Sequence, residues 1–213
     1  MVSQNAVSED DIVLNEVLSD KDIPGEPPFR AYIEATVYDK DGSVIQHHRQ
    51  PMRSLTQYFL GLIAINIIGT YQNSSTNYAP SLITNIFGFS SQVSANYSII
   101  FWSWSIQLGS GTQSFSPTLN SLAAPILNGT GTGELEYGTT SVSYTPTSII
   151  SILTVFNPTA STITVSEIGL FATITLYNVS SYTFLLSYDT FSTPISIPGY
   201  GSASFQITIS FSG

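Results

Sequence analysis

The sequence contains no cysteine, which excludes disulfide bonds and thiolate metal ligands and leaves packing and strand pairing to stabilise the fold. Charge is also scarce, because only 9% of the 213 residues are charged, against roughly 25% in typical soluble domains. What the chain does have is a hydrophobic content of 42%, enough for a sizeable core. Hydroxyl and amide side chains must therefore provide most of the polar surface.

Positive charge ends early in the chain. The formal net charge is −9, and no Lys, Arg or His follows Arg53. The cationic residues are Lys21, Arg30, Lys40, Arg49 and Arg53. Because nucleic-acid binding depends on cations that neutralise phosphates, we expect no nucleic-acid partner.

Residues 1–28 differ from the rest in composition. They are acidic, begin MVSQNAVSEDD and lack the basic and apolar segments of a secretion signal, so export by that route is not expected. Ser8 with the following acidic turn is typical of a helix N-terminus, and IPGEPP then prevents a helix from continuing. We interpret residues 1–28 as an N-terminal arm that either docks on a neighbouring subunit or frays, and residues 29–213 as one domain.

The rest of the chain is patterned mainly as β-strands. FRAYIEATVYD and SVIQHHRQ flank the turn DKDG and alternate polar with apolar residues, which predicts a hairpin. The other strand-like stretches are YSIIFWSWSIQL, SIISILTVFNP, STITVSEIGLFATITLYN, SYTFLLSYDTF and SASFQITISFSG. We therefore predict an all-β protein, an antiparallel β-sandwich of jelly-roll type.

One apolar stretch, SLTQYFLGLIAINIIG, does not fit the strand pattern. It is too apolar for a surface helix and shorter than the roughly 20 residues that span a bilayer. We predict a buried helix around residues 54–68, packed in the core or between subunits. Membrane contact is the less favoured alternative, because the flanks lack basic anchors.

Two glycine-rich stretches invite comparison with phosphate-binding loops. IQLGSGTQSFSPTL has no lysine, and Ser116 and Pro117 follow where such a loop would open a helix. We expect Gly109 and Gly111 to supply positive φ in a connection between strands, and GTGTGE at 129–134 to form a turn. No nucleotide or other cofactor is predicted.

Few side chains are suited to catalysis. His47 and His48 are adjacent in a predicted strand and face opposite sides, so they cannot act in one site or chelate one metal ion together. Glu134 and Glu136 share a predicted strand face, as the two carboxylates of a glycosidase site can, but blunting a sheet edge is the simpler interpretation. The other carboxylates in the second half of the chain are Glu167 and Asp189. We predict no catalytic residue, no metal site and no enzyme, with a carboxylate-pair glycosidase as the least favoured alternative.

A binding function is the second alternative. Aromatic side chains that could stack on sugars, in a host-receptor or glycan-binding module, are Trp102, Trp104, Tyr137 and Tyr144, although strand aromatics more often belong to the core. Four Asn-x-Ser/Thr sequons, at Asn73, Asn96, Asn128 and Asn178, match the number that chance gives in so Ser- and Thr-rich a chain and leave glycosylation open.

Three stretches together resemble, in the same order, a pattern of structural proteins from tailed phages and archaeal viruses. They are VYDKDGSVIQHHRQPMRSLTQYFLGLI, IQLGSGTQSFSPTLNSLAAPI, and LTVFNPTASTITVSEIGLFA with LLSYDTFSTPISIPGYGSASFQITISFS. The likeness covers most of residues 35–212, and the low charge is most similar to virion components of spindle-shaped or turreted viruses of hyperthermophilic archaea. The acidic arm and the tyrosine of LLSYDTF depart from the pattern.

The resemblance implies a β-rich subunit that assembles in symmetric rings or lattices, and it carries over no catalytic residue. The expectation is therefore a non-enzymatic virion subunit, a tail or vertex adaptor whose partners are copies of itself and other virion proteins.

Overall fold

The computed structural model describes residues 29–60, 99–176 and 181–211. The predicted arm at 1–28 and most of the predicted helix lie outside these residues. The described strands are β1 (Phe29–Tyr38), β2 (Val44–Pro51), β3 (Ile99–Gly109), β4 (Glu136–Tyr137), β5 (Ser141–Tyr144), β6 (Ser148–Phe156), β7 (Ile163–Leu176), β8 (Ser181–Ile197) and β9 (Ser202–Phe211). Each predicted strand has its counterpart among them.

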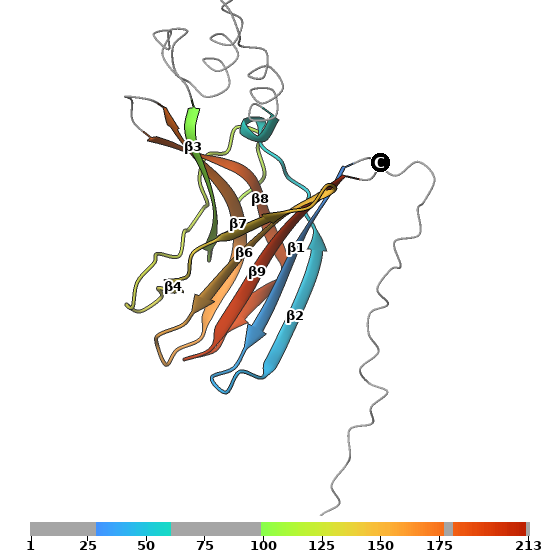
Figure 1. The fold of residues 1–213 in the computed structure, drawn as a ribbon. Helices are drawn as coiled ribbons and strands as arrows, with labels where there is room; N and C mark the ends of the chain where they lie inside the picture. The colour runs from blue at the N-terminus through green and yellow to red at the C-terminus, as the bar shows by residue number, and fades with distance from the viewer. Residues whose placement is uncertain (1–28, 61–98, 177–180, 212–213) are drawn as a thin grey trace, which may run out of the picture.

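The strands form two antiparallel sheets (Figure 1). The larger sheet has six strands in the order β2-β1-β9-β6-β4, with β5 also paired to β6, and the smaller has the order β3-β7-β8. The prediction of a mainly β, antiparallel protein is confirmed. The predicted hairpin is β1 with β2, and the Asp39 carboxylate closes its turn by accepting the N–H groups of Asp41 and Ser43, both at 2.9 Å.

The hydrophobic core lies between the two sheets, in a sandwich-like arrangement. Strands β1 and β9 bury every second side chain, as Ile33 and Phe205 do, because the strand period of two places these residues on the inner face. Leu153 of β6 and Leu170 of β7 belong to the same buried cluster. The alternation seen in the sequence is therefore the alternation between core and solvent in the six-stranded sheet.

The three-stranded sheet is covered on its outer face as well. Residues of the loop between β3 and β4 lie over this face, where Leu122 packs with Phe171, Leu185 and Tyr188 in a second buried cluster. Burial on both faces explains the unbroken buried run over 184–189 of β8.

The first residues of the predicted helix at 54–68 are not helical. Leu55 forms an antiparallel bridge with Ser187, and the Thr56 N–H donates to the Leu186 carbonyl at 2.9 Å, so residues 54–56 run beside β8 as extended chain. Helical structure is seen at 57–60, and the remainder of 54–68 lies outside the described residues. No helix within the described part is long and apolar enough to cross a membrane.

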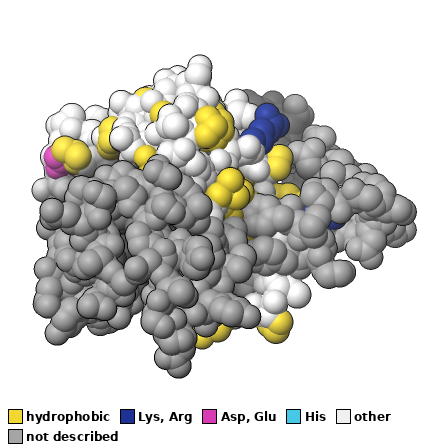
Figure 2. Space-filling view, turned by 90° about the horizontal axis from the view of Figure 1, so that it is seen from above, with side chains coloured by type: hydrophobic (Ala, Val, Ile, Leu, Met, Phe, Trp, Pro, Cys, Tyr) yellow, Lys and Arg dark blue, Asp and Glu magenta, His cyan; other side chains and the backbone are white. Residues whose placement is uncertain are grey.

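Charge is sparse on the surface, as the composition indicated. Seen from above, the described surface consists mostly of side chains that are neither charged nor hydrophobic, with hydrophobic ones scattered among them (Figure 2). Lys and Arg side chains lie on one side of this view, and an Asp or Glu side chain lies on the opposite side.

Candidate functional site

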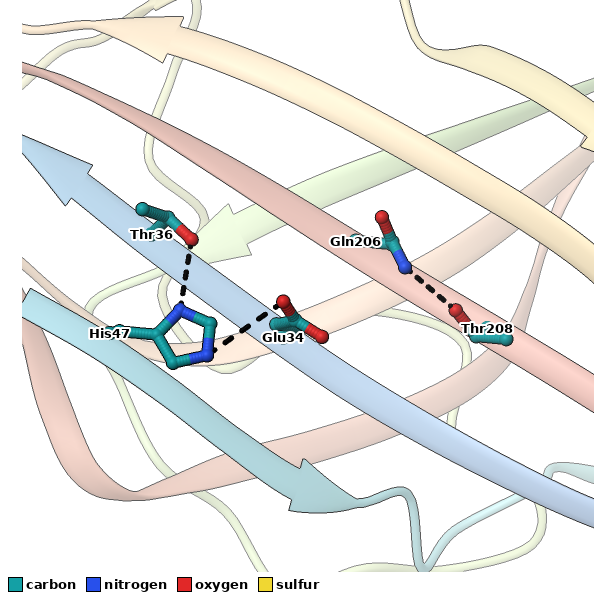
Figure 3. Close-up of polar contacts among 5 residues, drawn as sticks. All are labelled: Glu34, Thr36, His47, Gln206 and Thr208. Atoms are coloured by element: carbon teal, nitrogen blue, oxygen red, sulfur yellow. Dashed lines mark hydrogen bonds and ion pairs between the residues drawn. The ribbon is translucent and has the colours of Figure 1, made fainter. Parts of the chain in front are cut away.

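The outer face of the six-stranded sheet carries polar side chains in register. The even-numbered residues of β1 point to this face, where Thr36 pairs with His47 of β2 and Glu34 pairs with Arg49. The Thr36 hydroxyl bonds the His47 Nδ1 at 3.1 Å, and the His47 Nε2 lies 3.8 Å from the Glu34 carboxylate (Figure 3). These interactions are exposed and join β1 to β2 on the outer face of the sheet.

Two further features complete this outer face. The Arg49 guanidinium lies 4.7 Å from the centre of the Tyr32 ring, a cation–π contact that covers the ring. On β9, the Gln206 amide donates to the Thr208 hydroxyl at 3.0 Å (Figure 3). The face thus offers hydroxyl, amide and guanidinium groups rather than an apolar platform.

His48 points away from His47, as the strand pattern predicted. Its Nε2 lies 2.9 Å from the Gln50 Oε1, and its ring meets Phe191 edge-on. The two imidazoles therefore belong to different surroundings. Among the described residues, no group of three or more His, Asp or Glu side chains is arranged to hold a metal ion.

Side-chain amides of β2 join the two sheets along the edge of β8. Gln50 donates to the Thr190 carbonyl at 2.9 Å and accepts the Ser192 N–H at 3.1 Å. Gln46 accepts the Ser196 N–H at 3.2 Å and donates to the Pro194 carbonyl at 3.4 Å. We call Gln46 and Gln50 the amide clasp. It satisfies backbone groups of β8 where the β7-β8 register shifts and no strand pairs with that edge.

Asp189 continues the contact between β8 and the chain beyond the end of β2. Its carboxylate accepts the Arg53 N–H at 2.8 Å, and the neighbouring Tyr188 N–H donates to the Ser54 carbonyl at 3.2 Å. Burial raises the pKa of Asp189 to about 6, although the Arg53 and Ser54 backbone groups and the Arg53 charge act in the opposite direction. The carboxylate thus fixes the turn that brings residues 54–56 onto β8.

A second set of side chains closes the opposite side of the sandwich. The Tyr137 hydroxyl of β4 accepts the Leu108 N–H of β3 at 3.3 Å and donates to the Ile126 carbonyl at 3.0 Å. The Thr140 hydroxyl accepts the Ile106 N–H at 3.3 Å. Burial raises the pKa of Tyr137 to about 12. Tyr137 and Thr140, called here the hydroxyl clasp, occupy the exposed edge of β3 as the amide clasp occupies that of β8.

Glu167 is fully buried and holds the loop that covers the three-stranded sheet. Its two carboxylate oxygens accept the N–H groups of Ala123 and Ala124, at 3.0 and 2.8 Å. Nearby, the Tyr188 hydroxyl accepts the Gln113 N–H at 2.9 Å, and burial raises its pKa to about 12. Both groups act as anchors for residues 110–126.

The prediction that Gly109 and Gly111 supply positive φ is wrong. Neither has a positive φ. A Cβ on Gly109 would collide with the Glu167 side chain and lie 2.8 Å from the Ala124 carbonyl oxygen, and one on Gly111 would lie 2.9 Å from the Ala124 Cβ. Glycine is needed here for close approach of the loop rather than for backbone conformation.

The acidic pair considered for glycosidase chemistry lies at the β4 edge. Glu134 belongs to the turn before β4, where its carboxylate accepts the Gly131 N–H at 2.8 Å, and Gly133 has a φ of 81°. GTGTGE therefore forms the predicted turn. Glu136 begins β4 and is exposed.

The aromatic residues considered for sugar stacking are not gathered in one place. Trp104 and Tyr137 pack against the core, whereas Tyr144 of β5 is exposed. Trp102 belongs to β3, and its side chain lies outside the described set. Of the sequons, Asn128 uses its side-chain oxygen to accept the Tyr137 N–H at 3.0 Å. Asn73, Asn96 and Asn178 lie outside the described residues.

The clasps were not anticipated from the sequence, although a signal was present. Gln46, His48 and Gln50 recur at every second position of a predicted edge strand, on the side that should face the core. Three polar residues at inward positions indicate backbone groups that need partners.

Comparison of the chain with protein-family models, with curated proteins and with solved structures found no match.

Proposed function

We propose that this chain is a non-enzymatic structural subunit of a virion, which assembles with copies of itself and with other virion proteins into a ring or lattice. In finer detail, we propose a tail or vertex adaptor of jelly-roll type whose chain continues from residue 57 into a buried apolar helix. The proposal agrees with the resemblance of the sequence to phage and archaeal virus structural proteins.

The proposal is supported by the hydrogen bonds that polar side chains between the sheets and loops form with backbone groups. The carboxylates of Glu167 and Asp189 and the hydroxyls of Tyr137 and Tyr188 each bond backbone groups that join one strand or loop to another. In catalytic sites such groups face a substrate. Here they close the sandwich, as expected of a subunit whose task is to keep its shape within an assembly.

The oligomeric state of the purified full-length chain tests this function. We expect analytical ultracentrifugation to show a discrete oligomer or a concentration-dependent series, because a virion subunit must contact copies of itself. A strictly monomeric species at high concentration contradicts the proposal. Specific retention on immobilised polysaccharides by a protein that stays monomeric would favour the glycan-binding alternative.

A further inference from the structure

The distribution of exposed charge singles out one edge of the six-stranded sheet. Beyond Arg53, the charged side chains of the described residues are those of Glu134, Glu136, Glu167 and Asp189. Glu167 is 0% exposed and Asp189 is 7% exposed, and both are bound to backbone N–H groups. Of the other two, Glu136 is exposed at the start of β4, and Glu134 is half-buried with its carboxylate accepting the Gly131 N–H at 2.8 Å. Glu136 is therefore the accessible acid of this edge, with Glu134 beside it.

The opposite edge of the same sheet carries the opposite charge. Strand β2 forms this edge, and Arg49 of β2 and Arg53 just after it are exposed. The Tyr32 ring supports the Arg49 guanidinium from one side, which restricts its motion and leaves its N–H groups available. Of the acidic residues of the hairpin, Asp39 and Asp41 lie in the turn at the other end of β2, beside Val44, whereas Glu34 lies on β1 opposite Arg49 and 3.8 Å from His47. The two arginines therefore leave this edge with an excess of positive charge rather than with cations alone.

Each edge combines its charge with exposed apolar side chains. The basic edge, defined here as Val44, Ile45, Arg49 and Arg53, includes Val44 with 59% exposure. The acidic edge, defined as Leu127, Glu134, Glu136, Val142 and Tyr144, includes Leu127 with 64% and Tyr144 with 84% exposure. Exposed ion pairs alone contribute little, whereas apolar neighbours that exclude water add area burial and strengthen the charge interaction.

We propose that the acidic edge of one copy binds the basic edge of the next copy. This inference rests on the proposed role as an assembling subunit and assigns the surface by which it assembles. Because the sheet order β2-β1-β9-β6-β4 places the two edges on opposite sides, the contact is heterologous and repeats from copy to copy. Figure 2 shows Lys and Arg side chains on one side of the view and an Asp or Glu side chain on the other.

Charge reversal in the full-length chain tests this contact. We expect Arg49→Glu with Arg53→Glu, or Glu136→Lys alone, to weaken self-association at least about tenfold in sedimentation velocity, because like charges then face each other. The triple variant with all three changes should recover part of the association, because the lysine that replaces Glu136 then faces the two introduced glutamates, while Glu134 keeps its charge. Wild-type association should also weaken as salt is raised.

Lys40→Glu is the matched control, because it reverses a cation in the β1-β2 turn, outside both edges. Thermal unfolding verifies that each variant is folded. Folded charge-reversal variants that assemble like the wild type, or a triple variant that is no better than its parents, would overturn the proposed contact and leave the subunit role intact. A monomeric wild-type chain would instead contradict both the proposed contact and the proposed subunit role.

Discussion

At the scale of single residues, the two buried carboxylates of the described part of the chain serve structure. Glu167 and Asp189 are buried, each accepts backbone N–H groups, and each lies where a loop or a turn must be held against a sheet. An ionised carboxylate offers two oxygens to N–H groups, and its hydrogen bonds are stronger than those that a neutral hydroxyl accepts. The sequence showed that carboxylates are rare but not what they bind.

Asp189 should make stability depend on pH in mildly acidic solution. Its pKa is raised to about 6 from an ordinary value of 3.8, so the folded state holds the proton more tightly than the unfolded state. The stabilisation is fully present below about pH 4 and is lost as the pH rises through 6. Asp189→Asn, which keeps an oxygen for the Arg53 N–H without the charge, should flatten this part of the profile.

Denaturant unfolding between pH 4 and 8 measures this effect. The unfolding free energy of Asp189→Asn minus that of the wild type should increase as the pH rises. Glu136→Gln, which removes an exposed charge, is the control and should run parallel to wild type. A constant difference for Asp189→Asn across this range would refute the assignment.

At the scale of elements, the edges of the strands determine how the sheets are joined. The amide clasp on β8 and the hydroxyl clasp on β3 supply hydrogen bonds that a further strand would otherwise have supplied. Capping an edge in this way also prevents uncontrolled pairing with other chains. Strand positions followed from the period-two pattern, which also places Gln46 and Gln50 at inward positions. The groups that these side chains bond could not be predicted, because they depend on which strands of different sheets become neighbours.

The amide clasp should be a measurable part of the stability. Gln50→Ala removes the acceptor of the Ser192 N–H and the donor to the Thr190 carbonyl. We expect a loss of about 1 kcal/mol, because the Thr190 carbonyl is half-buried whereas water can reach the exposed Ser192 N–H. Amide hydrogen exchange at Ser192 should accelerate in the same variant. Gln206→Ala, which loses only a bond to Thr208 on the outer face, should cost less. Equal losses at the two positions would argue against the clasp.

At the scale of the whole molecule, one core connects both sheets. Buried residues of β1, β6 and β9 form a single cluster with those of β3, β7 and β8, so neither sheet buries its inner face without the other. The clasps at both sides and the loop over the three-stranded sheet reinforce this dependence. The two sheets should therefore unfold together.

We expect the described core to unfold in a single cooperative transition. Far-ultraviolet circular dichroism, which reports the strands, and near-ultraviolet circular dichroism, which reports Tyr and Trp packing, should give coincident denaturation curves. The physical reason is that separating the sheets exposes the shared core at once. Two separated transitions would show that the sheets fold independently.

The sequence by itself determined the strands, the β1-β2 hairpin, the inner and outer faces and the low surface charge, because these follow from local alternation, turn residues and composition. The start of the helical turn at 57 and the reason for Gly109 were decided by tertiary structure, through the bonds of residues 54–56 to β8 and the approach of Glu167. The same holds for the clasps and for the opposition of the acidic and basic edges. Each depends on the order of strands within a sheet and on contacts between residues distant in the chain, and a local pattern identifies at most one partner of such a contact.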